Sequence, residues 1–141
     1  MKISAKTQYA ALALLELAAR YETGDPARVR EIAAAHAIPA RFLVQILLQL
    51  KAAGLVASVR GAAGGYQLIR PPEEVTLAAV KSAMEGGSEP PGGEAGQASP
   101  QARALSDVWQ EAAEAQRELL AGVTLADLLE RAEASQPMYY I

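Results

Sequence analysis

The sequence contains no cysteine and a single histidine, His36. Without thiols the chain can form neither disulfides nor thiolate metal sites, and it offers no cysteine nucleophile or ligand for an iron–sulfur cluster. This composition fits the reducing cytoplasm, where we expect the protein to act. His36 has no second candidate ligand near it in the sequence, so we expect a polar residue near a helix end rather than a metal site.

Long apolar runs are also missing. The most apolar stretch near the start, residues 9–19, comes after Lys2 and Lys6 and has the length of a signal sequence. Because Glu16 interrupts this stretch, we expect a core helix rather than a secretory signal. No segment is long and apolar enough to predict a membrane span.

Catalytic patterns are missing as well. The glycine-rich residues 61–65 match neither a dinucleotide-binding nor a P-loop motif, and the pair Pro71 and Pro72 separates this loop from the next predicted helix. No Ser, His and Asp set stands out, and the pair Glu73 and Glu74 is typical of a solvated surface. We therefore expect no enzymatic activity and no cofactor or metal.

The two halves of the chain differ in charge. Residues 1–71 hold nine Lys and Arg against four Asp and Glu, a net charge of +5, whereas residues 72–141 hold four against twelve, a net charge of −8. A basic half indicates a nucleic-acid partner, and the acidic half indicates a different role. By charge alone, two solvated faces of one ordinary domain remain an equal alternative.

Residues 4–54 have the pattern of a helix-turn-helix. A buried helix is predicted over residues 4–24, a short second helix over 29–37 and a third over 40–54, with Pro39 at its first turn. The apolar residues that define these helices by their spacing are Tyr9, Leu12, Leu15 and 17–19 in the first, Val29, Ile32 and Ala33 in the second, and Phe42, Leu43, Ile46, Leu47 and Leu50 in the third.

Two short β-prone runs come next, residues 55–59 and 66–69, and the loop RGAAGG separates them. They predict a hairpin whose loop needs glycine for positive φ angles. A hairpin placed directly after the second helix of a helix-turn-helix is the wing of a winged helix. The sequence thus predicts a mainly α-helical fold with a small β-hairpin: a winged helix-turn-helix domain over residues 1–71, and a helical dimerisation or regulatory region over residues 72–141.

The second region consists of a helix at 74–86, a mobile loop rich in glycine and proline at 86–100, a long amphipathic helix at 101–123 and a short helix at 124–132. We expect the apolar side of the long helix to pair with the same helix of a second subunit, because it has little core of its own to cover; packing on the chain's own winged domain is the alternative. The residues of this side are Leu105, Val108, Trp109, Ala112, Leu119 and Leu120. The tail residues Met138, Tyr139 and Tyr140 are predicted to pack, with a ligand pocket as the alternative.

The candidate DNA contacts lie in the third helix and the wing. A guanidinium is favoured in a narrow minor groove, so Arg60, flanked by Gly61, Gly64 and Gly65, is the strongest candidate. In the third helix, Gln45 suits adenine, Arg41 suits guanine or phosphate, and Val44 suits a thymine methyl group. Lys2, Lys6 and Arg28 are candidate phosphate contacts. An ordinary solvated turn and an ordinary exposed helix face are the alternatives.

Several motifs together resemble the Rrf2 family of bacterial winged-helix regulators, which includes the IscR, NsrR and CymR types. They are MKISAKTQYA, IPARFLVQILLQLKAAGLV, SVRGAAGGYQL, VTLAAVKSAMEG and VTLADLLE, and the resemblance extends from Met1 to about Ala132. It implies a homodimeric repressor of a pseudo-palindromic DNA site, whose long helix crosses its partner and whose wing arginine enters the minor groove. It also implies DNA-contact positions at Pro39, Arg41, Phe42, Val44 and Gln45.

One departure from the family limits what can be carried over. Iron–sulfur members have three cysteines in the loop before the long helix, where this chain has none. We therefore expect no cluster, and the signal could come from another effector near the long helix, from a protein partner as in the CymR type, or from none. Some cluster-binding members have a polar or acidic residue in place of Val44, so their operators are not expected here. A protein-interaction module acting through the acidic half is the alternative function.

Overall fold

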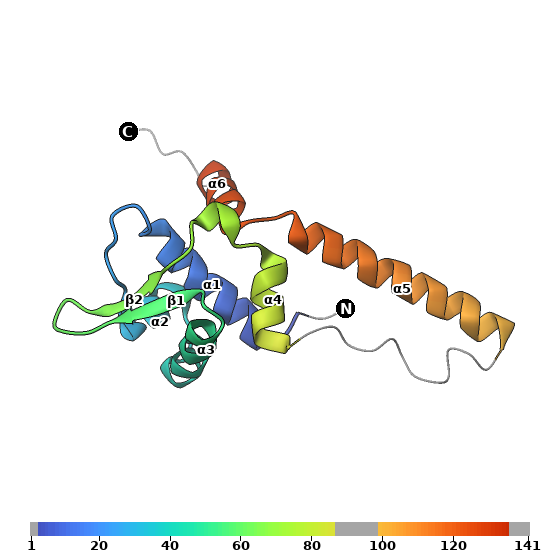
Figure 1. Ribbon diagram of the computed structural model, residues 1–141, viewed down its shortest axis with the longest axis horizontal. Coiled ribbons are helices and arrows are strands. Elements are labelled where there is room, and N and C mark those ends of the chain that lie inside the picture. The colour runs from blue at the N-terminus through green and yellow to red at the C-terminus, as the bar shows by residue number, and fades with distance from the viewer. Residues whose placement is uncertain (1–2, 87–98, 136–141) are drawn as a thin grey trace.

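The computed structural model describes residues 3–86 and 99–135 (Figure 1). Lys2, most of the predicted mobile loop and the tail residues 138–140 lie outside the described residues. The elements in chain order are α1 (Ala5–Ala19), α2 (Val29–His36), α3 (Ala40–Ala52), β1 (Val56–Val59), β2 (Gly65–Leu68), η1 (Pro72–Glu74), α4 (Leu77–Glu85), α5 (Pro100–Ala121) and α6 (Leu125–Ser135). This mainly helical architecture with one antiparallel hairpin confirms the predicted fold class.

Helix α1 is the central element of the core. The Ser4 side chain caps it by accepting a hydrogen bond from the amide of Thr7. The helix ends at Ala19, before the predicted Gly24, and Arg20 to Gly24 form turns instead. Its buried face also differs from the predicted one, because small side chains let neighbouring helices approach closely. That face consists of Ala10, Ala13, Leu14, Leu17 and Ala18, while Tyr9, Leu12 and Leu15 are half-buried and Ala19 is exposed.

Helices α2 and α3 form the helix-turn-helix. The chain bends by 116° between them over the three residues 37–39, as in this motif elsewhere. Ala37 makes the turn in the left-handed conformation, with φ 53° and ψ 44°. Its amide donates a hydrogen bond to the carbonyl of Ala33, which satisfies one of the last carbonyls of α2.

The buried stripe of α3 is narrower than predicted. Leu43, Ile46, Leu47 and Leu50 are buried, but Phe42 is 60% exposed. Phe42 lies about 100° around the helix axis from the fully buried Leu43, at the border of the buried face, where its side chain is left uncovered. The prediction that Phe42 belongs to the core-facing stripe is therefore wrong.

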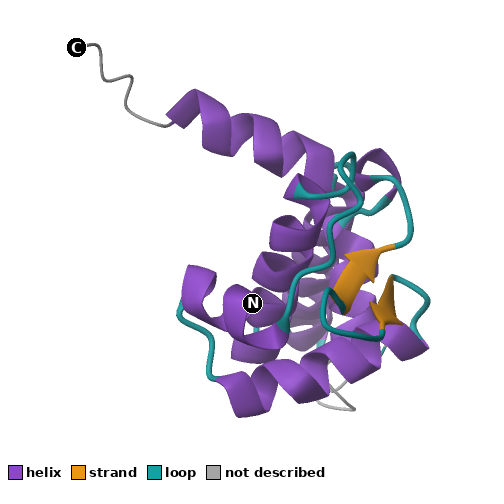
Figure 2. Ribbon diagram, turned by 90° about the vertical axis from the view of Figure 1, so that its left-hand side faces the viewer, coloured by secondary structure: helices purple, strands orange, loops and turns teal. Residues whose placement is uncertain are grey.

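Strands β1 and β2 pair antiparallel, with Val56 opposite Leu68 and Val59 opposite Gly65. Figure 2 shows both strands lying against the helices at one side of the molecule. Val56 of β1 and Leu68 of β2 are the buried residues of the two strands, and the loop residues 60–63 at the other end of the hairpin are exposed. This is the geometry of a wing.

Helices α4 and α6 pack on the same core as the winged part of the chain. Val80 and Met84 of α4 and Leu125 of α6 are buried in one cluster with α1 and α3. A short bridge joins the segments before these helices, where the Leu125 amide donates to the Val75 carbonyl at 2.9 Å. The predicted boundary after residue 71 thus marks a change of charge, while packing continues across it.

Helix α5 leaves this core. None of its residues is buried, and in Figure 1 it extends away from the other helices, toward the end of the molecule opposite the wing. Ser99 caps its N-terminus and Pro100 occupies its first turn. The chain after its C-terminal end is bound to the core, since the Leu77 amide donates a 2.9 Å hydrogen bond to the carbonyl of Val123.

Over the described ranges, no single helix has the length and apolar character to cross a membrane, although α2 and α3 meet that requirement when they are taken together as a bent pair.

Candidate DNA-binding surface

Helix α3 presents a continuous exposed face. Arg41, Val44 and Gln45, all predicted DNA contacts, are exposed and lie on the side opposite the buried stripe. Leu48, which the sequence analysis did not single out, is 50% exposed on the same face, one turn after Val44. Its spacing from Val44 and its position off the buried stripe could have identified it. The face therefore offers one guanidinium, one amide and two apolar groups.

Pro39 and Phe42 lie at the start of this helix. Pro39 is exposed as the N-cap residue, and its carbonyl accepts a hydrogen bond from the Leu43 amide. With Phe42 also exposed, all five positions implied by the family resemblance, at the N-cap and in the first half of α3, are on the surface. They form one group with the exposed face of α3.

The wing is joined to the end of α3. The Lys51 ammonium donates a 2.8 Å hydrogen bond to the hydroxyl of Ser58 in β1. Arg60 comes directly after β1 and is exposed. Lys51 thus fixes β1 to the candidate recognition helix, and the backbone carries Arg60 from there into the wing loop.

The three glycines of the wing differ in their structural surroundings. Gly61 is exposed with φ +105°, and a Cβ atom there would meet nothing within 4 Å. A Cβ on Gly64 would lie 2.2 Å from the Val59 carbonyl oxygen, and one on Gly65, at φ +147°, would lie 2.4 Å from that of Ala27. Gly64 and Gly65 are therefore required by contacts inside the molecule, in addition to any approach to DNA.

Exposed positive charge is present on α3, on the wing and at the start of α2. Arg28, Arg30, Arg41 and Arg60 are exposed, and none of them pairs with a carboxylate within residues 3–86 and 99–135, in contrast to Arg20. Lys6 is half-buried in the first turn of α1. Exposed basic side chains that form no ion pair are free to contact a phosphate backbone.

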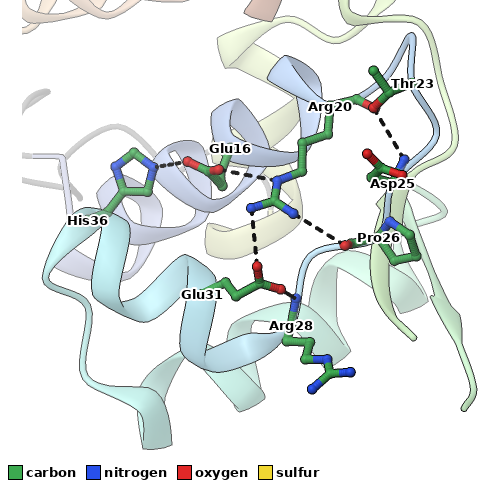
Figure 3. A network of polar contacts seen from close by, with 8 residues as sticks. All are labelled: Glu16, Arg20, Thr23, Asp25, Pro26, Arg28, Glu31 and His36. Carbon is green, nitrogen blue, oxygen red and sulfur yellow. Dashed lines mark hydrogen bonds and ion pairs between the residues drawn. The ribbon is translucent and has the colours of Figure 1, made fainter. Parts of the chain in front are cut away.

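An open cleft of about 560 Å³ separates the wing loop from the start of α2, and it is lined by Arg20, Asp25, Pro26, Arg28, Arg30, Glu31, Ala63 and Gly64. The Glu31 carboxylate accepts a 2.9 Å hydrogen bond from the amide of Arg28. This bond, followed by the charge and hydrogen bond of Arg20, lowers the pKa of Glu31. Figure 3 shows the Arg28 side chain pointing away from Glu31 and toward the outside.

The predicted dimerisation residues lie on α5. Five of them, Leu105, Val108, Trp109, Ala112 and Leu119, are exposed, and Leu120 is half-buried. Trp109 is 65% and Leu119 66% exposed. In the single chain this stripe does not pack on the winged domain, and a large apolar surface is left uncovered.

His36 has a structural partner. Its Nε2 atom lies 3.0 Å from Oε1 of Glu16, which joins the end of α2 to α1. Where the structure describes the chain, no group of three or more His, Asp and Glu side chains is placed to hold a metal ion.

Comparison with known proteins decides which family this fold represents. Residues 3–131 match the Rrf2 family, described as "Iron-dependent Transcriptional regulator". The chain belongs to the Rrf2 family. A relative in Mycobacterium tuberculosis, Rv1287, which carries the name of an HTH-type transcriptional regulator, is 37% identical over 138 residues. That similarity covers 91% of this chain and 81% of the relative.

Two solved Rrf2 structures share the fold over almost the whole chain. IscR of T. potens has a TM-score of 0.81 at 31% identity and covers 99% of this chain and 95% of its own. CymR of B. subtilis, named the global cysteine regulator of that organism, has a TM-score of 0.82 at 32% identity and covers 93% and 98%. The predicted family and the winged helix-turn-helix fold are confirmed, and this Rrf2 protein is a transcriptional regulator rather than an enzyme.

Proposed function

We propose that this Rrf2 protein is a homodimeric, sequence-specific DNA-binding repressor that acts in the cytoplasm without an iron–sulfur cluster. The observation that carries the proposal is the exposed face of α3, where Arg41, Val44 and Gln45 stand together on a helix of the right length to enter a major groove. These side chains can distinguish base pairs by hydrogen bonds and by contact with a thymine methyl group.

The wing adds a second contact to each half-site. Arg60 stands at the end of β1, and the Lys51 to Ser58 hydrogen bond ties that strand to α3. When α3 occupies a major groove, the wing lies near the adjacent minor groove, where a narrow A·T-rich sequence attracts a guanidinium. Arg28 and Lys6 then supply phosphate contacts that fix the orientation of the protein.

Dimerisation rests on α5. A 22-residue helix with no buried residue and an exposed apolar side needs a partner surface. A second copy of α5 provides one under two-fold symmetry, which also repeats α3 and the wing on a pseudo-palindromic site. This arrangement supports the prediction that Leu105, Val108, Trp109, Ala112, Leu119 and Leu120 form the interface.

The residues present do not fit the iron–sulfur cluster that the family description suggests. Clusters are held by cysteine thiolates, in some cases with histidine. The sequence has no cysteine, and His36, its one histidine, contacts Glu16. Metal analysis of protein made and purified without oxygen tests this point: we expect no stoichiometric iron, and one or more irons per chain would contradict it.

DNA binding is tested by the salt dependence of affinity for two variants. Arg60→Ala is expected to lower affinity by about 1–3 kcal/mol, and Lys6→Ala to reduce the log–log salt slope by about 0.9, the value of one phosphate contact. The matched control is Arg131→Ala, an exposed arginine of α6. Unchanged affinity in both variants would contradict the proposal and favour a protein-interaction module. Repression predicts fewer transcripts in vitro from a promoter that contains the site.

A further inference from the structure

Arg20 lies where three parts of the winged domain meet. It is the C-cap residue of α1, and its side chain is 28% exposed. The guanidinium contacts Oε2 of Glu16 at 3.4 Å and Oε2 of Glu31 at 3.6 Å, and it donates a 3.3 Å hydrogen bond to the carbonyl of Pro26 (Figure 3). With two carboxylates beside it, this guanidinium is compensated and is a poor candidate for a phosphate contact.

These contacts support residues 26–28 from one side. Arg20 holds Pro26 directly, and it holds Arg28 through Glu31, whose Oε1 accepts the Arg28 amide at 2.9 Å. Ala27, between them, is fully buried. A planar guanidinium with several fixed donors suits this role, since one side chain satisfies acceptors in three directions.

The wing rests on the other side of the same residues. The Ala27 amide donates to the Tyr66 carbonyl at 2.9 Å, and the Tyr66 amide donates to the Ala27 carbonyl at 2.8 Å. The Gln67 side chain also donates to the carbonyl of Gly24. Gly65 also lies against Ala27, since a Cβ atom on Gly65 would be 2.4 Å from the Ala27 carbonyl oxygen.

A two-stranded hairpin is only marginally stable by itself, so its direction depends on what it is attached to. Strand β1 is attached to α3 through Lys51, and β2 is attached to residues 26–28. We propose that Arg20 is a positioning residue for DNA recognition: it holds residues 26–28 against β2 and thereby sets the direction of the wing that carries Arg60. This inference rests on the proposed DNA-binding function, although its first test does not need DNA.

The first test is amide hydrogen exchange of the dimeric full chain. Arg20→Gln is expected to speed exchange at the Ala27 and Tyr66 amides about tenfold, while the α3 core amides keep their protection. Glu31→Gln, at an exposed carboxylate, should also speed exchange at these two amides, but by less. This variant keeps the test possible if Arg20→Gln does not fold. The matched control is Lys81→Gln, which breaks an ion pair of similar exposure between Lys81 and Glu85. Unchanged exchange at both amides, or a uniform rise across the core, would overturn the proposal.

The second test is a double-mutant cycle on DNA. If Arg20 acts through the wing, Arg60→Ala should cost about tenfold in affinity in the normal protein and less than about threefold in the Arg20→Gln background. With Lys81→Gln as background, the full cost should remain. An equal cost in all backgrounds would show that Arg20 does not act through Arg60. If the unsubstituted protein binds DNA without sequence preference, the proposed function is contradicted. The amide hydrogen exchange of Arg20→Gln would still decide whether Arg20 holds the wing.

Discussion

The Thr7 hydroxyl donates a 2.6 Å hydrogen bond to Oε2 of Glu85, 78 residues later in the chain. The Ser4 hydroxyl and the Lys81 ammonium also contact this carboxylate, at 3.3 and 3.2 Å. The contacts tie the first turn of α1 to the last turn of α4. The Thr7 hydrogen bond is the main cause that lowers the pKa of Glu85, because it favours the charged form.

We predict that Thr7→Val destabilises the protein in a pH-dependent way. A lowered pKa in the folded state contributes stability that is present above the ordinary carboxyl pKa of 4.5 and lost as pH falls through the folded value. Thr7→Val should therefore cost about 1–2 kcal/mol at pH 7 and less at pH 3. Urea unfolding followed by circular dichroism at fixed protein concentration measures this. Thr23→Val is the control for pH dependence, because the hydroxyl of this exposed threonine bonds backbone groups and no carboxylate. A cost of Thr7→Val that is independent of pH would contradict the assignment.

Substitution of Gly65 by alanine should displace the wing. The new Cβ would overlap the Ala27 carbonyl, and φ +147° is unfavourable for any L side chain. We expect a loss of about 2 kcal/mol or more in stability and changed amide chemical shifts at Ala27 and Tyr66. Ala63→Gly, in the exposed part of the same loop, serves as control. A Gly65→Ala protein with normal stability and unchanged shifts would refute this reason for the glycine.

Ala37→Gly should stabilise the protein. Ala37 adopts a left-handed conformation that glycine tolerates without steric cost. We expect a gain of about 0.5–1 kcal/mol in the free energy of unfolding. The same change at Ala34, exposed and inside α2, should instead cost about 1 kcal/mol, since glycine weakens a helix interior. Thermal unfolding of the two variants gives the comparison, and a loss of stability at both positions is the result that would count against the prediction.

Trp109→Glu should separate the subunits. A charge placed in the apolar stripe of α5 must be desolvated in an interface, so we expect the dimer dissociation constant to rise about a hundredfold or more. Leu119→Glu should act alike. Gln110→Glu, on the other side of α5, adds the same charge and should leave the dimer intact. Sedimentation equilibrium measures the mass, and a Trp109→Glu dimer of normal affinity would rule out this interface.

The spacing of apolar residues predicted the helices well, because it depends on which side of each helix is buried. The spacing of Leu43, Ile46, Leu47 and Leu50 identified α3, and the glycine-rich loop identified the hairpin. Periodicity placed Phe42 on the wrong face, because a residue at the border of a stripe is buried only if the neighbouring helices reach it.

Contacts between segments that are distant in the chain could not be predicted from the local sequence pattern. Gly65 was predicted to serve the wing loop and approach to DNA, whereas its nearest neighbour is Ala27, from the start of the helix-turn-helix. Arg20 was not singled out, since its partners Pro26 and Glu31 share no spacing that marks them as a set. The exposed face of α3 could be predicted from the sequence, but the support of the wing required the structure.

The proposed dimer reads a specific DNA sequence through α3 and the wing. Selection of bound fragments of the source genome by the purified protein, at moderate salt and without an added effector, tests this proposal most directly. We expect an enriched pseudo-palindromic motif with half-sites about one helical turn apart. Binding without an enriched motif, or no binding at all, would contradict the account.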